Sequence, residues 1–255
     1  MLSYHSLTSD SWSSSYSSSP GATAVPTGCN AIENVLYLQA AALLANKLPN
    51  VSPTGAATGG FKYFNQAMNA YNWFYNGTGS AFFTSSDLLY DNLIISSDPK
   101  TNCTGNKASA MLTYNQGPII SGLSELGRAT GEANTQPYHE KAIAIANATI
   151  TFYTNDTSNI FKERCEPKCA ANEQQFKGIF MRNLQYLVNN AEYLPEADKD
   201  SFTKFLLDNA DSIMRIYPNG DIREDWDAAI TDTSSVATLS SGLDAIVAAA
   251  AVVSS

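Results

Sequence analysis

The chain has 255 residues, of which 44% are hydrophobic and 11% aromatic, and this is enough to bury one large core in a single domain. Its formal net charge of −9 argues against the basic surface that binding of nucleic-acid phosphates or anionic lipid requires. The acidic residues are spread along the chain, as on an ordinary solvated surface. We therefore expect no nucleic-acid partner.

Residues 1–27 are rich in Ser, Thr, Gly and Pro and show no apolar periodicity, so we expect a loop or a disordered end there. Neither a basic nor an apolar leader segment follows Met1, so no signal peptide is recognisable. No uninterrupted stretch of about eighteen apolar residues occurs, and we expect no membrane span. The apolar run from Ala245 to Val253 is interpreted as a packed last helix, in preference to a lipid-anchor signal.

From Asn30 onward, apolar residues recur at steps of three and four, which predicts core-facing helices. The predicted helices cover residues 30–48, 61–75, 116–130, 137–152, 174–190, 197–216 and 238–252. Gly131 is expected to end the third helix, and Pro137 suits the first turn of the fourth. Strand signals are confined to short stretches such as residues 88–95, so the fold class is all-α.

Two long connections, residues 78–114 and 153–173, argue against a four-helix bundle with short loops. A toroid of helical hairpins fits the pattern better. In such a fold an inner ring of helices surrounds a core, and the long loops gather at one end, where they shape a groove.

The cysteines argue against a metal or redox site. Cys29, Cys103, Cys165 and Cys169 match neither a paired CxxC zinc pattern nor a CxxC redox motif, and the chain has only two histidines. We expect no metal and no cofactor. Four cysteines fit two disulfides in an exported protein, and the sequence leaves all three pairings open.

Five Asn-X-Ser/Thr sequons support export of the chain as a glycoprotein. They begin at Asn50, Asn76, Asn102, Asn147 and Asn155. The alternative is that they arise by chance in a chain rich in Asn and Thr.

The stretch Thr113-Tyr114-Asn115-Gln116-Gly117 is followed by a Leu-rich segment that ends in Arg-Ala-Thr-Gly at residues 128–131. It closely resembles the TYNQG pattern and the following RATG helix of glycoside hydrolase family 76, the α-1,6-mannanases. At a helix N-terminus, amide side chains and free backbone N–H groups can bond sugar hydroxyls, and an aromatic ring can stack on a pyranose face. The alternative is that Asn115 merely caps the helix.

A second match is Phe-Lys-Gly-Ile-Phe-Met-Arg-Asn-Leu at residues 176–184, preceded by Cys165 and Cys169. It is similar to the family's Cys-loop and the FKGIFxRxL helix that follows. Lys177 is a cation between core residues, so it needs a carboxylate or hydroxyl partner. The alternative is a solvated or structurally paired lysine.

Three weaker matches occur in the same order as in the family. They are Asn-Ala-Ile-Glu-Asn at residues 30–34, Leu-Tyr-Asp-Asn-Leu at residues 89–93, and Ser-Ser-Gly-Leu-Asp-Ala at residues 240–245. The second stands at the family's LxxDG loop, with Asn92 in place of glycine, and Asn also tolerates left-handed backbone geometry. Asp91 in this loop is a candidate for sugar contact. Its alternative role is a loop cap or a support for the binding residues.

The resemblance covers about residues 29–250 and implies a partial (α/α)6 barrel over residues 28–255 that acts on α-1,6-linked mannan or mannoprotein glycan. The site residues that it implies are Tyr114, Asn115 and Gln116, with Asp91 and Lys177 behind them. In the family, two adjacent aspartates do the acid-base and nucleophilic work, because glycoside hydrolysis needs paired carboxylates. This sequence has no Asp-Asp pair, and the family's pair precedes the segment matched at residues 30–34. We therefore assign no catalytic residue.

Three hypotheses follow. In the first, the chain derives from a secreted or cell-wall-associated α-1,6-mannan hydrolase or transglycosidase and lacks an N-terminal segment, so this chain alone is inactive. In the second, it is a non-catalytic carbohydrate-binding or interaction protein that kept the groove. In the third, it is a different all-helical protein and the short matches are coincidental. Water access and acceptor affinity decide between hydrolysis and transfer, and the sequence leaves that choice open.

Overall fold

The computed structural model describes residues 28–48, 59–94, 106–107, 110–131, 135–154, 158–228 and 233–254. The predicted N-terminal loop, Cys103 and three sequons, those at Asn50, Asn102 and Asn155, lie outside these residues. The helices within them are α1 (Ala31–Lys47), α2 (Gly59–Asn76), α3 (Thr113–Thr130), α4 (Gln136–Tyr153), α5 (Phe176–Asn190), α6 (Glu196–Ile216) and α7 (Val236–Val253). Two short 3-10 helices, η1 (Thr78–Phe82) and η3 (Glu173–Gln175), complete the helical part. The all-α prediction is confirmed, and every predicted helix is present.

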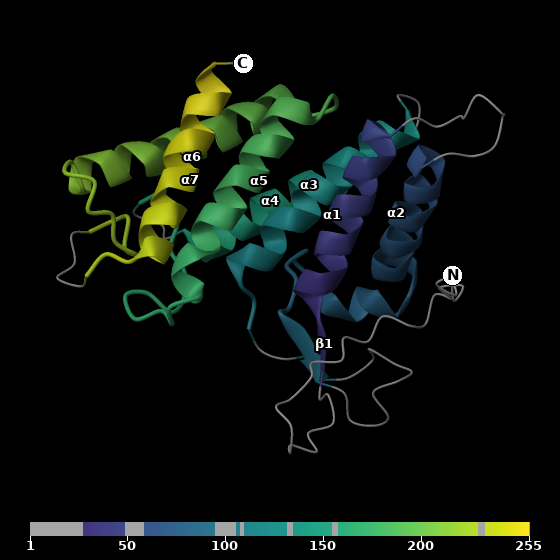
Figure 1. Ribbon diagram of the computed structural model, residues 1–255, viewed down its shortest axis with the longest axis horizontal. Coiled ribbons are helices and arrows are strands. Elements are labelled where there is room, and N and C mark those ends of the chain that lie inside the picture. The colour runs from purple at the N-terminus through teal and green to yellow at the C-terminus, as the bar shows by residue number, and fades with distance from the viewer. Residues whose placement is uncertain are drawn as a thin grey trace.

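Helices α1, α3, α5 and α7 pack against one another in that order, while α2, α4 and α6 pack behind them. Figure 1 shows this row of helices spread across the molecule, from α7 in yellow to α1 in purple. Alternation of inner and outer helices along the chain is the pattern of an (α/α) toroid, as predicted. The starts of α1 and α3 both contact Asp91, and Gly117 of α3 lies against Ile179 of α5. The N-terminal ends of these three helices therefore lie close together, where the matched motifs begin.

Two motif glycines are explained by close helix packing. A Cβ atom on Gly178 of α5 would lie 2.6 Å from the Cα atom of Ser241 on α7. A Cβ atom on Gly117 of α3 would lie 3.0 Å from the carbonyl oxygen of Ile179 on α5. Since larger side chains do not fit at these backbone contacts, the two glycines set the spacing of the inner helices.

A small antiparallel sheet joins the loop after η1 to the start of α1. Its strands β1 (Gly28–Asn30), β2 (Asn92–Ile94) and β3 (Asn106–Lys107) pair in the order β1-β2-β3. The strand signal at residues 88–95 is therefore confirmed in β2. Directly before β2, the Asp91 carbonyl accepts a 2.8 Å hydrogen bond from the Ala31 amide, so the candidate residue Asp91 lies at the N-terminus of α1.

The core lies between the inner and outer helices and includes Phe74, Phe161, Phe180, Phe205 and Trp226, all essentially without solvent exposure. The two end helices of the row keep exposed apolar side chains. On α1 these are Leu36 and Leu43, and on α7 they include Leu239, Leu243 and Val247. Among the described helices, α7 alone has the length and mean hydropathy, 1.9, of a membrane span, a weak indication because core helices also pass this test. In this fold it packs against α5 and α6.

Candidate functional site

A pocket of about 460 Å³ opens between α1, α3 and α5 and is lined by residues from the N-terminal turns of these helices. Its size is within the range of small-ligand sites, and its walls combine apolar and polar side chains. The lining residues are Ile32, Leu36, Gln39, Tyr114, Pro118, Ile179, Arg182, Asn183 and Tyr186. The pocket therefore brings together three segments that the motif comparison singled out separately.

Tyr114 is the predicted site residue that lines this pocket. Its hydroxyl donates a 2.6 Å hydrogen bond to Oδ1 of Asp91, and its ring stacks on Phe176 with the ring centroids 4.2 Å apart. The same Asp91 oxygen accepts a 2.8 Å bond from Nδ2 of Asn115. Asp91, Tyr114 and Asn115 thus form one contiguous group, in which the carboxylate orients both the phenol and the amide.

Gln116 has a structural place in this fold. Its side chain is fully buried, and it pairs with the backbone of Leu89 by accepting the amide proton at 3.0 Å and donating to the carbonyl at 2.9 Å. These two bonds hold the Asp91 loop against α3. The expectation that Gln116 touches sugar directly is corrected here, because its amide has no surface to offer.

Asn115 is also fully buried, and its Oδ1 has no hydrogen-bond partner. The alternative that it caps α3 is wrong, since the N-cap residue is Leu112 and no side chain caps the helix start. Asn115 lies in the first helical turn, where its side-chain amide donates a hydrogen bond to the Asp91 carboxylate.

Lys177 is buried and does not line the pocket. Its side chain is 3% exposed, and its ammonium group lies 2.7 Å from Oε1 of Glu166 and 2.6 Å from the carbonyl oxygen of Glu224. It also lies 4.0 Å from the centre of the Trp226 ring. The predicted need for a carboxylate partner is confirmed. The geometry is that of the alternative named above, a lysine with a structural ion pair. We therefore also correct the expectation that Lys177 contacts sugar directly, because its ammonium group, like the Gln116 amide, is buried.

Polar residues that the sequence interpretation missed supply most of the pocket's donors and acceptors. Nε2 of Gln39 donates to Oγ of Ser121 at 2.6 Å and to Oδ1 of Asn183 at 2.9 Å, which connects α1, α3 and α5. Arg182 forms a 3.0 Å ion pair with Asp244 of α7. Arg182 and Asn183 lie inside the matched motif at residues 176–184, and this position could have marked them as site residues. No sequence pattern marked Gln39.

Tyr186 completes the wall of the pocket, and its hydroxyl donates to the buried carboxylate of Glu125. Burial, followed by the hydrogen bond to Glu125 and its charge, raises the pKa of Tyr186 to about 12. Tyr114, Arg182 and Tyr186 are thus each fixed by a carboxylate that does not line the pocket. The Tyr114 and Tyr186 hydroxyls donate their single proton to these carboxylates, so toward the pocket they offer ring faces and an acceptor oxygen, while Arg182 supplies N–H donors.

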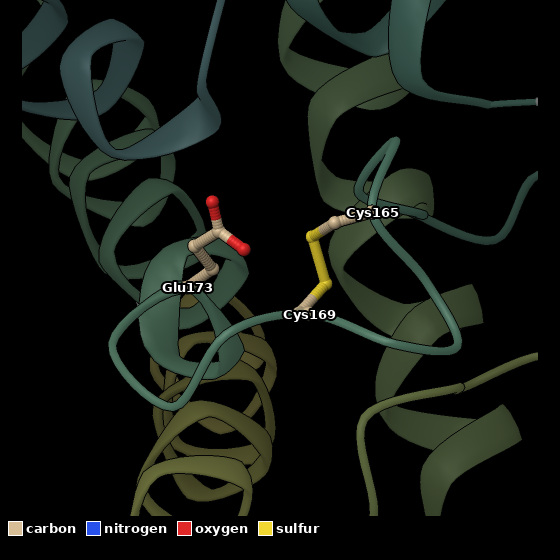
Figure 2. A group of neighbouring side chains, drawn as sticks. All are labelled: Cys165, Cys169 and Glu173. Atoms are coloured by element: carbon tan, nitrogen blue, oxygen red, sulfur yellow. A yellow bond between two sulfur atoms is a disulfide. The ribbon is translucent and has the colours of Figure 1, made fainter.

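Among the described residues, one group has the arrangement of metal ligands, namely Cys165, Cys169 and Glu173. The two sulfur atoms are joined in a disulfide, which Figure 2 shows beside the Glu173 carboxylate. That carboxylate accepts a 2.7 Å hydrogen bond from the Ala170 amide. With both thiols oxidised the group lacks the thiolates that would bind a metal ion, and it serves to close the loop before α5.

The fold and the pocket define the class: an (α/α) toroid with a polar and aromatic pocket between three of its inner helices. Residues 23–254 match glycosyl hydrolase family 76, and the chain belongs to this family. Over 154 residues, or 57% of this chain, it is 29% identical to the mannan endo-1,6-alpha-mannosidase DCW1 of Candida glabrata, of which this covers 30%.

Solved structures share the fold. An α-1,6-mannanase of Salegentibacter sp. HEL1_6, in complex with α-1,6-mannotetraose, is similar with a TM-score of 0.70 at 22% identity. The similarity covers 90% of this chain and 61% of that one. Dfg5 of Chaetomium thermophilum, in complex with glucosamine, has a TM-score of 0.64 at 17% identity, over 89% of this chain and 51% of that one. The match thus spans between 30% and 61% of the length of these relatives.

The Salegentibacter complex is an inactive variant in which two adjacent aspartates are replaced by alanine. This chain has no adjacent pair of aspartates anywhere in its sequence. Its pocket has no carboxylate among the lining residues. The lining of the described pocket therefore contains no pair of carboxyl groups of the kind that glycoside hydrolysis uses.

Proposed function

We propose that this chain binds α-1,6-linked mannan, or the equivalent mannoprotein glycan, in the Tyr114 pocket. In this proposal it forms the glycan-binding part of an endo-acting α-1,6-mannanase or transglycosidase. The observation that carries it is the grouping of Tyr114, Gln39, Arg182 and Asn183 around one pocket in a family 76 fold. The mannotetraose complex of the Salegentibacter relative and the mannosidase name of the Candida relative support the choice of glycan.

The chemistry of the lining suits a hexose. Tyr114 and Tyr186 offer rings for the apolar faces of the sugar, and Ile32 and Ile179 extend the apolar wall. Arg182 carries hydrogen-bonding groups for vicinal hydroxyls, and the Asn183 amide, which accepts from Gln39 and Ser121, holds the polar wall of the pocket in place. Because the donors are already held by carboxylates and amides in this structure, a ligand would order few side chains when it binds, which favours affinity.

Cleavage is a separate requirement. Hydrolysis of a glycosidic bond needs one carboxyl group to protonate the leaving oxygen and a second to attack or to activate water. Asp91 cannot supply both, and it is engaged with Tyr114 and Asn115. We propose that this chain by itself binds α-1,6-mannan without turnover, and that carboxylates outside the described pocket complete the active site of the enzyme from which it derives.

A non-catalytic carbohydrate-binding protein is the second candidate function. The absence of a carboxylate from the pocket lining favours it. Both functions predict oligosaccharide binding by this chain. They differ in whether addition of a carboxylate-bearing partner segment restores cleavage, which reducing-end release from α-1,6-mannan measures.

Export from the cytosol is part of the proposal. The Cys165–Cys169 disulfide is typical of oxidising compartments, and two sequon asparagines in the described residues, Asn76 and Asn147, are exposed. Both lie on outer helices, α2 and α4, and neither lines the Tyr114 pocket. Glycans at these positions would leave the pocket accessible.

The binding proposal is tested by calorimetric titration of α-1,6-mannotetraose into the chain and into the variant Tyr114→Ala. We expect saturable binding that weakens at least about tenfold in the variant, because one stacked ring and one oriented hydroxyl are lost. Arg223→Ala serves as a control, since Arg223 pairs with Asp221 and does not line the pocket. Equal affinity in Tyr114→Ala and the parent chain would contradict the proposal.

A further inference from the structure

The segment between α4 and α5, residues 158–175, runs past the starts of two helices that line the pocket. Phe161 anchors it in the core, and the Cys165–Cys169 disulfide closes its turn. Two carboxylates three residues apart on this segment, Glu163 and Glu166, have their side chains buried. Each is directed to a different inner helix.

Glu163 holds the start of α3. Its Oε1 atom accepts a 3.0 Å hydrogen bond from the Thr113 backbone amide and a second bond from the Thr113 hydroxyl. The amides of a first helical turn have no partner within the helix, so a carboxylate there satisfies a donor and interacts favourably with the helix dipole. Thr113 directly precedes Tyr114, and Glu163 therefore acts one residue away from the pocket.

Glu166 holds the start of α5. Its Oε1 atom lies 2.7 Å from the Lys177 ammonium group and accepts a 2.7 Å hydrogen bond from the Glu163 backbone amide. Lys177 follows Phe176, the ring on which Tyr114 stacks. The same loop thus fixes the neighbours of both stacked rings, and Glu163 is the member that reaches the helix of Tyr114.

We propose that Glu163 is a positioning residue for the sugar pocket: by holding Thr113, its ionised carboxylate sets the first turn of α3 and the placement of Tyr114. The proposal rests on the proposed function for the ligand, α-1,6-linked mannose units. It assigns no contact between Glu163 and the sugar, because the Glu163 side chain is buried and does not line the pocket.

The surroundings of Glu163 make its interaction with Thr113 sensitive to pH near neutrality. Burial, partly offset by the two bonds from Thr113 and by the Lys177 charge, raises the pKa of Glu163 to about 7. The charged and titratable groups that face it are Glu166 on its own loop, Lys177 on α5 and Tyr153 on α4. On α3 it meets the uncharged Thr113.

Only the ionised carboxylate accepts both Thr113 bonds at full strength, since charged acceptors form stronger hydrogen bonds than neutral ones. Sugar affinity should therefore rise with pH between about 6 and 8. Folding stability should change in the opposite direction, because a raised folded-state pKa means that stability falls as Glu163 ionises. If Glu163 had only a structural role, sugar affinity and folding stability would change with pH in the same direction. Opposite directions therefore indicate a positioning role.

The experiment measures α-1,6-mannotetraose affinity by calorimetry at pH 6 and pH 8 on the full chain. We expect the parent chain to bind about threefold or more tightly at pH 8 than at pH 6. Glu163→Gln should bind like the parent at pH 6 and lose the pH slope, because the amide oxygen still accepts from Thr113 and does not titrate. Glu163→Ala should bind about tenfold more weakly at both pH values.

Leu206→Ala is the matched control, since Leu206 is a fully buried residue of α6 that does not line the pocket. This variant loses stability but should keep the affinity and the pH slope of the parent chain. An unchanged slope in Glu163→Gln, parental affinity in Glu163→Ala, or a loss of affinity in Leu206→Ala equal to that in Glu163→Ala would overturn the proposal.

A readout without ligand keeps this test separate from the proposed function. In amide NMR spectra, the Thr113 and Tyr114 resonances should titrate with a midpoint near pH 7 in the parent chain, as burial of Glu163 implies, and remain flat in Glu163→Gln. If no sugar binds while these resonances titrate, the mannan proposal fails, and the proposal that Glu163 positions the start of α3 is retained. If they do not titrate, the Glu163 proposal fails whatever the sugar does.

Discussion

The phenol of Tyr114 is bonded to Asp91 across 2.6 Å, and this bond joins the first turn of α3 to the loop that also caps α1. Asp91 accepts through one oxygen from Tyr114 and Asn115, and its carbonyl accepts from Ala31. Two inner helices are therefore oriented by one loop residue. The shape of the pocket between these helices therefore depends on the contacts that Asp91 makes.

Replacement of Asp91 by Ala should weaken mannotetraose binding about tenfold, because the Tyr114 hydroxyl loses its orienting acceptor. The same change leaves the buried Asn115 amide without a partner, so we expect a loss of about 1–3 kcal/mol in the free energy of unfolding. Asp91→Asn keeps an oxygen acceptor at this position and should retain most of both. Calorimetry and urea denaturation measure the two effects. Parental binding in Asp91→Ala would show that Tyr114 needs no orientation.

Replacement of Gly178 by Ala should destabilise the fold by about 1–3 kcal/mol, because the new Cβ atom would lie 2.6 Å from the Ser241 backbone. Gly117→Ala meets its neighbours at 3.0 Å and more, so its effect should be smaller. Urea denaturation midpoints give the order of the two variants. A reversed order would mean that α5 and α7 separate more easily than α3 and α5.

Replacement of Lys177 by Met should cost about 3–5 kcal/mol of stability, because it leaves the Glu166 carboxylate buried without its cation. Lys204→Met is the matched control, since its ion pair with Asp208 is on the surface, where such pairs contribute at most about 1 kcal/mol. Chemical denaturation of both variants measures the difference. Similar small losses in the two would indicate that the Glu166 carboxyl is neutral in the folded protein.

The stability of the parent chain should fall as pH rises through 7 by more than that of Glu163→Gln. Burial raises the Glu163 pKa to about 7 in the folded state, above its ordinary value of 4.5. The contribution of this group is complete below about pH 4.5 and is lost as it ionises in the folded protein. Urea midpoints from pH 5.5 to 8 test this, and parallel curves for the two proteins would contradict it.

The fold was predictable from the sequence because apolar periodicity reports directly which helix faces are buried. Part of the site was predictable too: the motif comparison selected Tyr114 and Asp91, which the structure joins by a hydrogen bond. It also selected Gln116 and Lys177, whose polar groups are directed into the protein. A motif marks a position in the chain, but the direction of a polar side chain depends on neighbours that only tertiary packing supplies.

The missed residues make the same point. Gln39 reaches the pocket because α1 packs beside α3, and Glu163 reaches Thr113 across 50 residues of sequence. Neither stands in a recognisable pattern. Both contacts follow from the order of the inner helices, which periodicity alone does not define.

Chemical-shift mapping with α-1,6-mannotetraose tests the central claim most directly. We predict saturable perturbations of the Gln39, Tyr114 and Arg182 signals, and none with an equal concentration of a β-1,4-linked glucose tetramer. A second hollow of about 300 Å³, beside Tyr75 and Lys141 between α2 and α4, provides an internal reference. Perturbations confined to that hollow, or equal responses to both sugars, would contradict a mannan site at Tyr114.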